Sequence, residues 1–271
     1  MEAKDSNQFS KPVFGTREWA GTSENCLIGC RNGCKYCYAL ESNVRRKRPM
    51  PIDRKQEILK PGALTRGFRK RERRIMFPTK HDISPDYLVE CMDFLEHMLL
   101  PGNRVLVVSK PRLECIKAVC ERFTPYRSQI LFRFTIGSTD SSTLRFWEPN
   151  APDLEERLVS LEHAFRQGYQ TSISCEPMLD AKAEEVIRAT EPYLTDCIWL
   201  GKMNKLNFRL KLNGEDDPVT LARARELNRS HSDEFIQDLY SRCKDNPRVK
   251  WKSSIKKIVG LEIATEPGLD K

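Results

Sequence analysis

The chain alternates short apolar runs with helical patterns from about residue 75 onward, and this alternation limits its fold more than any other feature. Runs of β-branched, aromatic and leucine residues are typical of buried strands. Strands separated by helices are typical of a parallel sheet whose connections cross over through those helices. The predicted strands cover residues 74–77, 104–109, 130–136, 170–174 and 196–201, with a weaker candidate at 19–23.

Two helices between these strands have clear start signals. Ser84 and Pro85 suit an N-cap and a first helical position, and apolar residues then recur on one face. Asp153 can cap the second helix while Glu156 reaches back to it, and Gly168 ends it. Weaker helical patterns cover residues 112–122 and 181–190. Six strand–helix units in about 200 residues predict an α/β fold, a partial open (β/α)6 barrel rather than a closed eight-unit barrel.

We expect one domain over residues 1–271, since 39% apolar residues suffice for a single core. Its core spans about 17–202, with a basic insertion at 45–74 and a closing segment at 203–271. Within the closing segment, the turn-forming pairs at 213–214 and 217–218 predict a long connection over 203–232. Residues 235–251 read as a helix followed by a short strand.

Neither a membrane span nor a targeting segment is evident. No run of about 18 or more apolar residues occurs, which argues against a membrane-spanning helix. The first residues, MEAKDSNQFSKPVF, lack the apolar middle of a secretory signal and the Arg-rich character of a transit peptide. We therefore expect a cytoplasmic protein with no membrane partner.

Positive charge is concentrated in one segment. Residues 45–74 contain thirteen Lys or Arg and three acids, whereas the rest of the chain has 33 basic and 35 acidic residues. The segment therefore carries a net charge of +10 in a chain of net charge +8. Such a segment is either a solvated loop or a surface that binds phosphates, and its position beside the cysteine cluster makes nucleic acid a candidate partner.

Cysteines are clustered near the N-terminus. Four of the ten lie within twelve positions, at Cys26, Cys30, Cys34 and Cys37. Structural disulfides are rare in reducing compartments, so clustered thiols there indicate metal binding or catalysis. The other six cysteines are scattered, and we expect most of them to be small buried hydrophobic residues.

Three of the clustered cysteines have a spacing that can surround one metal centre. Cys30, Cys34 and Cys37 form C-x3-C-x2-C, and the glycines in this loop let the backbone wrap tightly. Zinc and iron both suit thiolates, but the second Cys/His pair of most structural zinc sites is missing. Cys26 could complete a closed four-cysteine cluster, although the spacing differs from that of ferredoxins. With three ligands, a four-iron cluster would keep one iron open.

The motif Cys30-x3-Cys34-x-Tyr36-Cys37 resembles the signature of the radical S-adenosylmethionine (SAM) superfamily. This resemblance implies that Cys30, Cys34 and Cys37 hold a [4Fe-4S] cluster and that Cys26 is spare. It also implies that the open iron binds SAM, whose reductive cleavage gives a 5′-deoxyadenosyl radical that abstracts hydrogen from a substrate. Reduced ferredoxin or flavodoxin would be the electron donor, and the barrel would be of the radical SAM type.

A closer resemblance covers residues 26–179. The stretches CKYCYA, FPTKHD, VLVVSKP and FTIGSTD…EPNAPDLEERL are similar to the spore photoproduct lyase-like enzymes, which are DNA repair lyases. The stretches SCEPML and VKWKSSI also resemble a phage-associated radical SAM-like family of unknown function.

Candidate site residues follow from this resemblance and from the strand ends, where barrels of this kind gather their chemistry. The resemblance implies that Lys110 lies near the SAM carboxylate and Ser138 near its ribose. Cys175 is the best placed cysteine to return a hydrogen atom, whereas His81 reads as an ordinary polar residue. The full set of expected cofactor-binding residues is Tyr36, Tyr38, Lys110, Ser138, Asp82 and Glu176.

Three functions remain open from the sequence. The first is a radical SAM enzyme acting on nucleic acid, with residues 45–74 on the phosphates and one base reaching the barrel mouth. The second keeps the radical chemistry but acts on tRNA, a peptide or a small metabolite. The third is a non-enzymatic module in which four thiolates hold zinc and the basic segment binds nucleic acid.

Overall fold

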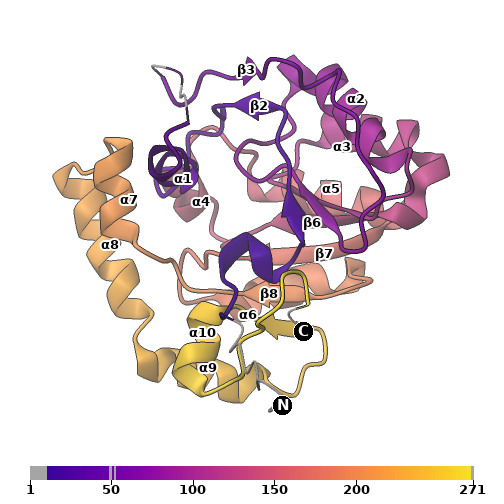
Figure 1. Cartoon of the computed structure of the whole chain (residues 1–271). Helices are drawn as coiled ribbons and strands as arrows, with labels where there is room; N and C mark the ends of the chain where they lie inside the picture. The colour runs from indigo at the N-terminus through magenta and orange to yellow at the C-terminus, as the bar shows by residue number, and fades with distance from the viewer. Residues whose placement is uncertain (1–10, 49–50, 52, 270–271) are drawn as a thin grey trace, which may run out of the picture.

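A computed structural model describes residues 11–48, 51 and 53–269 and contains a seven-stranded sheet in which every neighbouring pair is parallel. Strand order follows chain order, as expected for an open barrel built from successive strand–helix units. Figure 1 shows β6, β7 and β8 in this order. Residues 1–10, for which no targeting signal was expected, lie outside the described residues, as do 49, 50, 52, 270 and 271. The strands, in order across the sheet, are β1 (Thr22–Ser23), β4 (Ile75–Phe77), β5 (Val105–Ser109), β6 (Ile130–Thr135), β7 (Gln170–Cys175), β8 (Ile198–Leu200) and β9 (Val249–Trp251).

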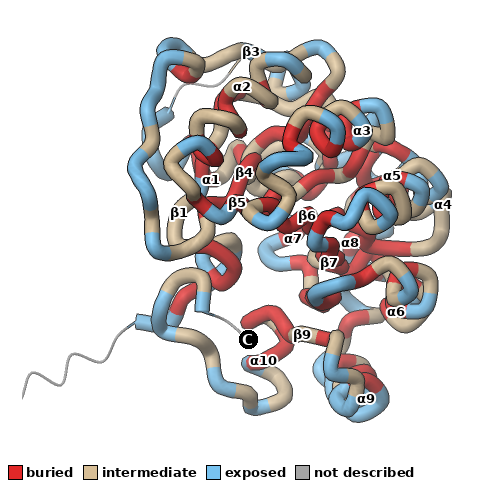
Figure 2. The backbone as a smooth tube through the Cα atoms, turned by 90° about the vertical axis from the view of Figure 1, so that its right-hand side faces the viewer, coloured by how far each residue is buried: buried red, intermediate tan, exposed pale blue. Residues whose placement is uncertain are grey.

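Helices connect the strands and cover the sheet. Helix α5 packs on β6 and β7 and also against α3 and α6. Figure 2 shows exposed residues on the outer sides of these helices, away from the sheet. Among the described residues, no helix is long and apolar enough to cross a membrane. The helices are α1 (Ala39–Arg45), α2 (Leu88–Leu99), α3 (Leu113–Arg122), α4 (Ser141–Trp147), α5 (Leu154–Arg166), α6 (Ala183–Thr190), α7 (Leu206–Asn213), α8 (Pro218–Ser230), α9 (Asp233–Cys243) and α10 (Ser253–Val259), with 3-10 turns at Gly15–Glu18, Pro85–Tyr87, Thr124–Gln129 and Glu191–Tyr193.

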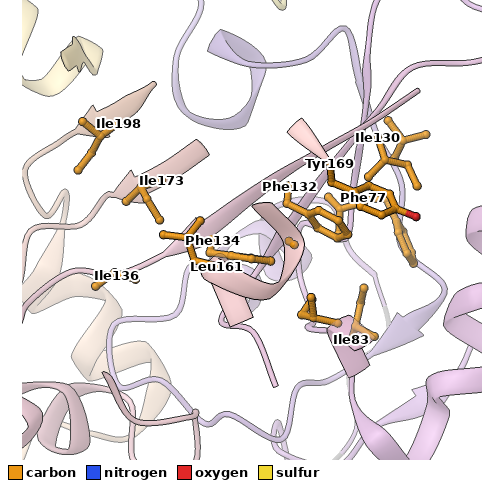
Figure 3. Close-up of a cluster of buried hydrophobic side chains, with 14 of the residues drawn as sticks. Phe77, Ile83, Ile130, Phe132, Phe134, Ile136, Leu161, Tyr169, Ile173 and Ile198 are labelled. Carbon is orange, nitrogen blue, oxygen red and sulfur yellow. The ribbon is translucent and has the colours of Figure 1, made fainter. Parts of the chain in front are cut away.

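The main core lies between the sheet and these helices. All six residues of β6 are buried, as expected for a central strand covered on both faces. Phe132 and Phe134 share one face of β6, with ring centroids 5.3 Å apart. Figure 3 shows them with Leu161 of α5 and Ile173 of β7 in one apolar cluster. Packing of these side chains fixes β6 and β7, and therefore the segments that follow the C-terminal ends of these strands.

Two parts of the predicted architecture need correction. The short strand predicted near the C-terminus joins the barrel sheet as β9, beside β8, so the sheet has seven strands where six were counted. Glu156 accepts from the backbone N–H of Leu113 rather than capping its own helix, while Asp153 does cap α5 as expected.

The predicted long connection over 203–232 is wrong, because it contains the helices α7 and α8. Gly214 has φ = 69° and ends α7 as a left-handed cap, so the Asn213–Gly214 pair is a helix end rather than a loop. Asp217 accepts from the N–H groups of Val219 and Thr220, and Pro218 takes the first position of α8. The turn-forming residues therefore mark one boundary between two helices, which project beyond the sheet in Figure 1.

A short antiparallel ribbon lies outside the barrel sheet. It pairs β2 (Leu27–Ile28) with β3 (Ile58–Leu59), which belongs to the basic insertion. Figure 1 shows this ribbon on the same side of the sheet as α1. The cysteine motif follows β2 directly, so the ribbon fixes where that motif begins.

Candidate functional site

The cysteine loop between β2 and α1 wraps closely against the basic insertion. Gly29 has φ = +81°, and a Cβ there would lie 1.8 Å from the backbone oxygen of Gln56, so only glycine fits. The N–H of Cys30 donates to the backbone oxygen of Arg54 at 3.0 Å. The Arg54 side chain donates in return to the backbone oxygen of Cys34 at 3.1 Å. The loop is therefore held from outside by the segment that carries the positive charge.

Cys30, Cys34 and Cys37 line one cavity of about 380 Å³. Cys26 is not among the residues that line it. The structure thus brings together the three cysteines of the motif and leaves the fourth apart. The charged side chains lining this cavity are Arg48, Arg54, Lys60 and Lys80.

The three thiols are close enough to influence one another. Burial raises the pKa of Cys30, and Asp82, Cys34 and Cys37 raise it further. Burial likewise raises the pKa of Cys34 to about 12, although Lys110 opposes this rise. Three cysteine sulfurs around a shared cavity, with Cys34 buried and Cys30 and Cys37 half-buried, fit an iron–sulfur cluster, whose formation releases the thiol protons.

The spacing of the sulfurs also separates a cluster from a single ion. Among the described residues, the one group of three or more Cys, His, Asp or Glu whose ligand atoms lie within 4.8 Å of one another is Cys26, His81 and Cys91. The three motif sulfurs are spread more widely. A four-iron cluster offers a separate iron to each thiolate, whereas a single zinc ion needs its ligands in contact with one atom.

A buried charge network lies beside Cys34. Glu148 forms an ion pair with Arg157 at 2.6 Å, and its other oxygen accepts from the Tyr36 hydroxyl and lies 3.6 Å from the Lys110 ammonium. Burial opposes the charge of Lys110, but Cys34 and Glu148 more than compensate and raise its pKa. Lys110 is thus a fixed cation close to Cys34 and Tyr36.

Asp82 joins the cysteine loop to two strand ends. One of its oxygens accepts from the Ser109 hydroxyl and from the N–H of Ile83, at 2.8 Å for the latter. The other oxygen accepts from Asn32 in the cysteine loop and from the N–H of Lys110, both at 2.8 Å. Protein donors therefore reach both oxygens of Asp82, an arrangement that positions the loop.

Ser138 and Tyr38 are both hydrogen-bonded within the protein. The Ser138 hydroxyl donates to Asp180 and accepts from the N–H of Asp140 at 2.8 Å. The Tyr38 hydroxyl donates to the backbone oxygen of Thr79, at the end of β4. These bonds fix the Tyr38 hydroxyl near the end of β4 and the Ser138 hydroxyl near the end of β6.

Glu176 follows β7 and faces a buried lysine. Lys252 lies 3.4 Å from Glu176 and 3.1 Å from Glu18, and its own side chain is 1% exposed. Glu176 raises the pKa of Tyr38, although burial of Tyr38 is the larger cause. Glu176 therefore sits within electrostatic reach of the cysteine-loop tyrosine.

Cys175, the expected hydrogen donor, lies in the hydrophobic core. Its side chain has 0% exposure, and it belongs to the apolar cluster that includes Ile173 and Ile198. Burial raises its pKa. It does not line the cysteine cavity, so its placement corresponds to packing rather than to contact with a substrate.

His81 and Cys26 meet away from the motif cysteines. The His81 Nε2 atom lies 3.8 Å from the Cys26 sulfur, and a second sulfur, that of Cys91, lies 3.6 Å from Cys26. A hydrogen bond from Cys91 lowers the pKa of Cys26 to about 5, although burial opposes this. The sequence groups Cys26 with the motif cysteines, as a possible fourth ligand or a spare one, and does not connect it with His81 or Cys91.

The sequence did not predict several charged residues that lie at the site, namely Glu148, Arg157, Asp180 and Lys252. A signal existed for Arg157, because it lies on the same helical face as Leu154 and Leu161 and therefore had to be buried. A buried arginine requires a buried partner, which is Glu148 here.

The basic insertion is divided between two places. Arg48, Arg54 and Lys60 line the cysteine cavity. Arg66 instead pairs with Glu24 at 2.7 Å, and Arg73 pairs with Glu266. Arg54, at the cavity, also pairs with Glu215 at 2.6 Å. The positive charge of residues 45–74 is therefore partly neutralised within the protein, both at the cavity and away from it.

Sequence comparisons give no relative. No protein-family model matches the chain, and no curated protein matches it. Its similarity to known proteins is therefore found in the structure.

Solved structures with the same fold include two radical SAM enzymes. SuiB from Streptococcus suis, bound to the precursor peptide SuiA, has 12% identity and a TM-score of 0.57 over 92% of this chain and 54% of SuiB. SuiB bound to S-adenosylmethionine has 12% identity and a TM-score of 0.54 with the same coverage. A spore photoproduct lyase variant with bound SAM and dinucleoside spore photoproduct has 14% identity and a TM-score of 0.56, over 90% of this chain and 79% of the lyase.

The chain spans about half the length of SuiB and most of spore photoproduct lyase. These likenesses confirm the expected partial barrel and the resemblance to the lyase at the level of the fold. The chain has the fold of the radical SAM enzymes.

Proposed function

We propose that this protein is a radical SAM enzyme in which Cys30, Cys34 and Cys37 hold a [4Fe-4S] cluster. The observation that carries the proposal is the convergence of three thiols, one buried and two half-buried, on one cavity that Cys26 does not line, inside a radical SAM fold. When bound, the cluster and SAM supply the electron and the 5′-deoxyadenosyl radical that abstracts hydrogen. Reduced ferredoxin or flavodoxin is the proposed source of the electron.

The charge network beside Cys34 would hold the cofactor end of the site rigid. Glu148 fixes Tyr36 through its hydroxyl and Lys110 through its ammonium, while Arg157 balances the carboxylate. Lys110 can then face an anionic group such as the carboxylate of SAM. We assign Lys110 to binding and Glu148 and Arg157 to positioning.

The remaining rim residues divide between binding and support. Tyr38, Ser138 and Glu176 stay candidates for contacts with SAM, since each follows a strand end or the motif. Asp82 is better suited to positioning, because protein donors already reach both of its oxygens. In this assignment Asp82 keeps the cysteine loop in register with β4 and β5.

Charge at the cavity supports an anionic substrate, and we favour nucleic acid with a lyase or repair chemistry. Partial burial, together with the positive charges of Arg48, Arg46 and Lys60, lowers the pKa of Lys80 to about 8. Arg54 at the cavity is paired with Glu215 at 2.6 Å, whereas, among the described residues, Lys60 and Lys80 donate only to neutral oxygens, those of Asn25 and Asn43. These two lysines therefore keep a positive field that phosphates can meet. The lyase structure of the same fold holds a dinucleoside lesion. A base would have to be flipped or single-stranded to reach the site.

A peptide substrate is the second candidate, because SuiB has the same fold and binds a precursor peptide. tRNA would meet the same basic cavity as DNA, and a small metabolite would fit its volume. Comparing nucleic-acid and peptide binding on the cluster-loaded protein separates these classes.

The test of the reaction is anaerobic reconstitution with iron and sulfide, followed by reduction in the presence of SAM. We expect 5′-deoxyadenosine from the wild-type protein and none from Cys30→Ala, Cys34→Ala or Cys37→Ala. Cys243→Ala, at the end of α9, is the matched control and should retain the product. Protein that takes up zinc but no iron at the motif cysteines would instead support the non-enzymatic zinc module.

A further inference from the structure

Cys26, His81 and Cys91 come from three separate parts of the chain and converge in the core. Cys26 precedes β2, His81 follows β4, and Cys91 lies on α2. Their exposures are 0%, 7% and 1%. The Cys26 sulfur lies 3.6 Å from the Cys91 sulfur and 3.8 Å from His81 Nε2, and all three ligand atoms lie within 4.8 Å of one another.

These separations suit a tetrahedral zinc ion. Zinc binds thiolate sulfur at about 2.3 Å and imidazole nitrogen at about 2.0–2.1 Å, which corresponds to ligand separations of roughly 3.8 Å between sulfurs and 3.5 Å between sulfur and nitrogen. The Cys26–Cys91 and Cys26–His81 separations lie close to these values. The third separation, between the Cys91 sulfur and His81, is within 4.8 Å.

The imidazole already has the orientation that a ligand requires. His81 Nδ1 lies 2.8 Å from the backbone oxygen of Asp82, which can only accept, so Nδ1 carries the proton and Nε2 keeps its lone pair. Nε2 accepts from the N–H groups of Cys26 and Leu27 at 3.2 and 3.3 Å. Both bonds are long, and the Phe77 ring packs edge-on against the imidazole at 5.8 Å.

We propose that Cys26, His81 and Cys91 form a second metal site, separate from the motif cysteines, that takes one zinc ion. Two thiolates neutralise a divalent cation, so the loaded site carries no net charge in the core, and a neutral imidazole adds none. A solvent molecule would take the fourth position, since the described Cys, His, Asp and Glu residues supply three ligands there.

The site would brace the cysteine loop. Cys26 lies four residues before Cys30 and directly before the β2–β3 ribbon, whereas Cys91 is fixed in α2 by the main core. A bond from each to one ion would tie the start of the loop to the barrel. This role does not depend on whether the motif cysteines bind iron.

Metal content of the full-length protein tests the site. As-purified, cluster-loaded protein should contain about one zinc per chain besides its iron. In Cys91→Ala the zinc should fall below about a tenth of that content, because a ligand is lost, while the iron content stays the same. Cys115→Ala, another buried cysteine on the neighbouring helix α3, should keep both metals. Wild-type protein with iron but no zinc, or Cys91→Ala with undiminished zinc, would overturn the proposal.

Cobalt(II) titration gives a second readout that is independent of the cluster. A Cys30→Ala/Cys34→Ala/Cys37→Ala variant should still bind one cobalt with the thiolate charge-transfer absorption of a tetrahedral site. Adding Cys91→Ala should weaken this binding by at least about a hundredfold. Absence of the absorption from the folded triple variant would contradict the zinc site, whereas its presence there, with no iron in the wild type, would contradict only the proposed cluster.

Discussion

Arg157 of α5 lies 2.6 Å from Glu148, and neither side chain has any exposure to solvent. Removing one partner of such a pair leaves the other charge buried without compensation, which typically costs about 3–5 kcal/mol. We therefore expect Glu148→Gln to lower the free energy of unfolding by about that amount, as measured by urea denaturation. Glu162→Gln, which breaks a surface pair with Arg166 on the same helix, should change it by less than about 1 kcal/mol. Equal effects of the two substitutions would contradict the assigned role of the buried pair.

The same pair predicts a dependence of stability on pH. Burial opposes the charge of Glu148, but Arg157 and Lys110 prevail and lower its pKa from 4.5. A carboxyl group with a lowered folded-state pKa contributes stability that is fully present above its unfolded pKa and is lost as the pH falls through the folded pKa. The stability difference between wild type and Glu148→Gln should therefore be constant near neutrality and shrink below about pH 4.5. A difference in the free energy of unfolding that grows as the pH falls would contradict a lowered pKa of Glu148 in the folded protein.

Basic residues at the cavity should control nucleic-acid binding. Replacing Arg48 and Lys80 by Gln should weaken binding of a single-stranded oligonucleotide and reduce the slope of log K against log salt by about one for each phosphate that the protein no longer neutralises. Arg73→Gln is the matched control, because Arg73 pairs with Glu266 and lies outside the cavity lining. Fluorescence anisotropy at several salt concentrations measures both quantities. An affinity that does not change with salt would show that phosphates are not bound at the cavity.

The barrel could be predicted from the sequence because most of its strands are short apolar segments that are recognisable without knowledge of their neighbours. The predicted run at 130–136 became the fully buried β6, and the Asp153 cap was found at the start of α5. The error over 203–232 arose because residues that terminate helices, such as Gly214 and Asp217, also occur in loops. A glycine or an Asp–Pro pair alone does not indicate whether a helix precedes it, follows it or is absent.

The site was only partly predictable for a different reason. Local spacing revealed Cys30, Cys34 and Cys37, since these residues are neighbours in sequence as well as in space. The contact between Cys26 and Cys91 joins segments 65 positions apart, so no local pattern could indicate it. Strand-end reasoning placed Cys175 at the rim, but it could not tell that its side chain is buried in the core.

Mössbauer spectroscopy of the iron-loaded protein, with and without SAM, tests the central claim most directly. Three cysteine ligands leave one iron of the cluster without a protein ligand, so SAM should change the spectrum of that iron alone. We predict that about a quarter of the absorption shifts when SAM is added and that the rest stays unchanged. A spectrum that SAM leaves unaltered, or a motif that binds no iron, would contradict the proposed cluster.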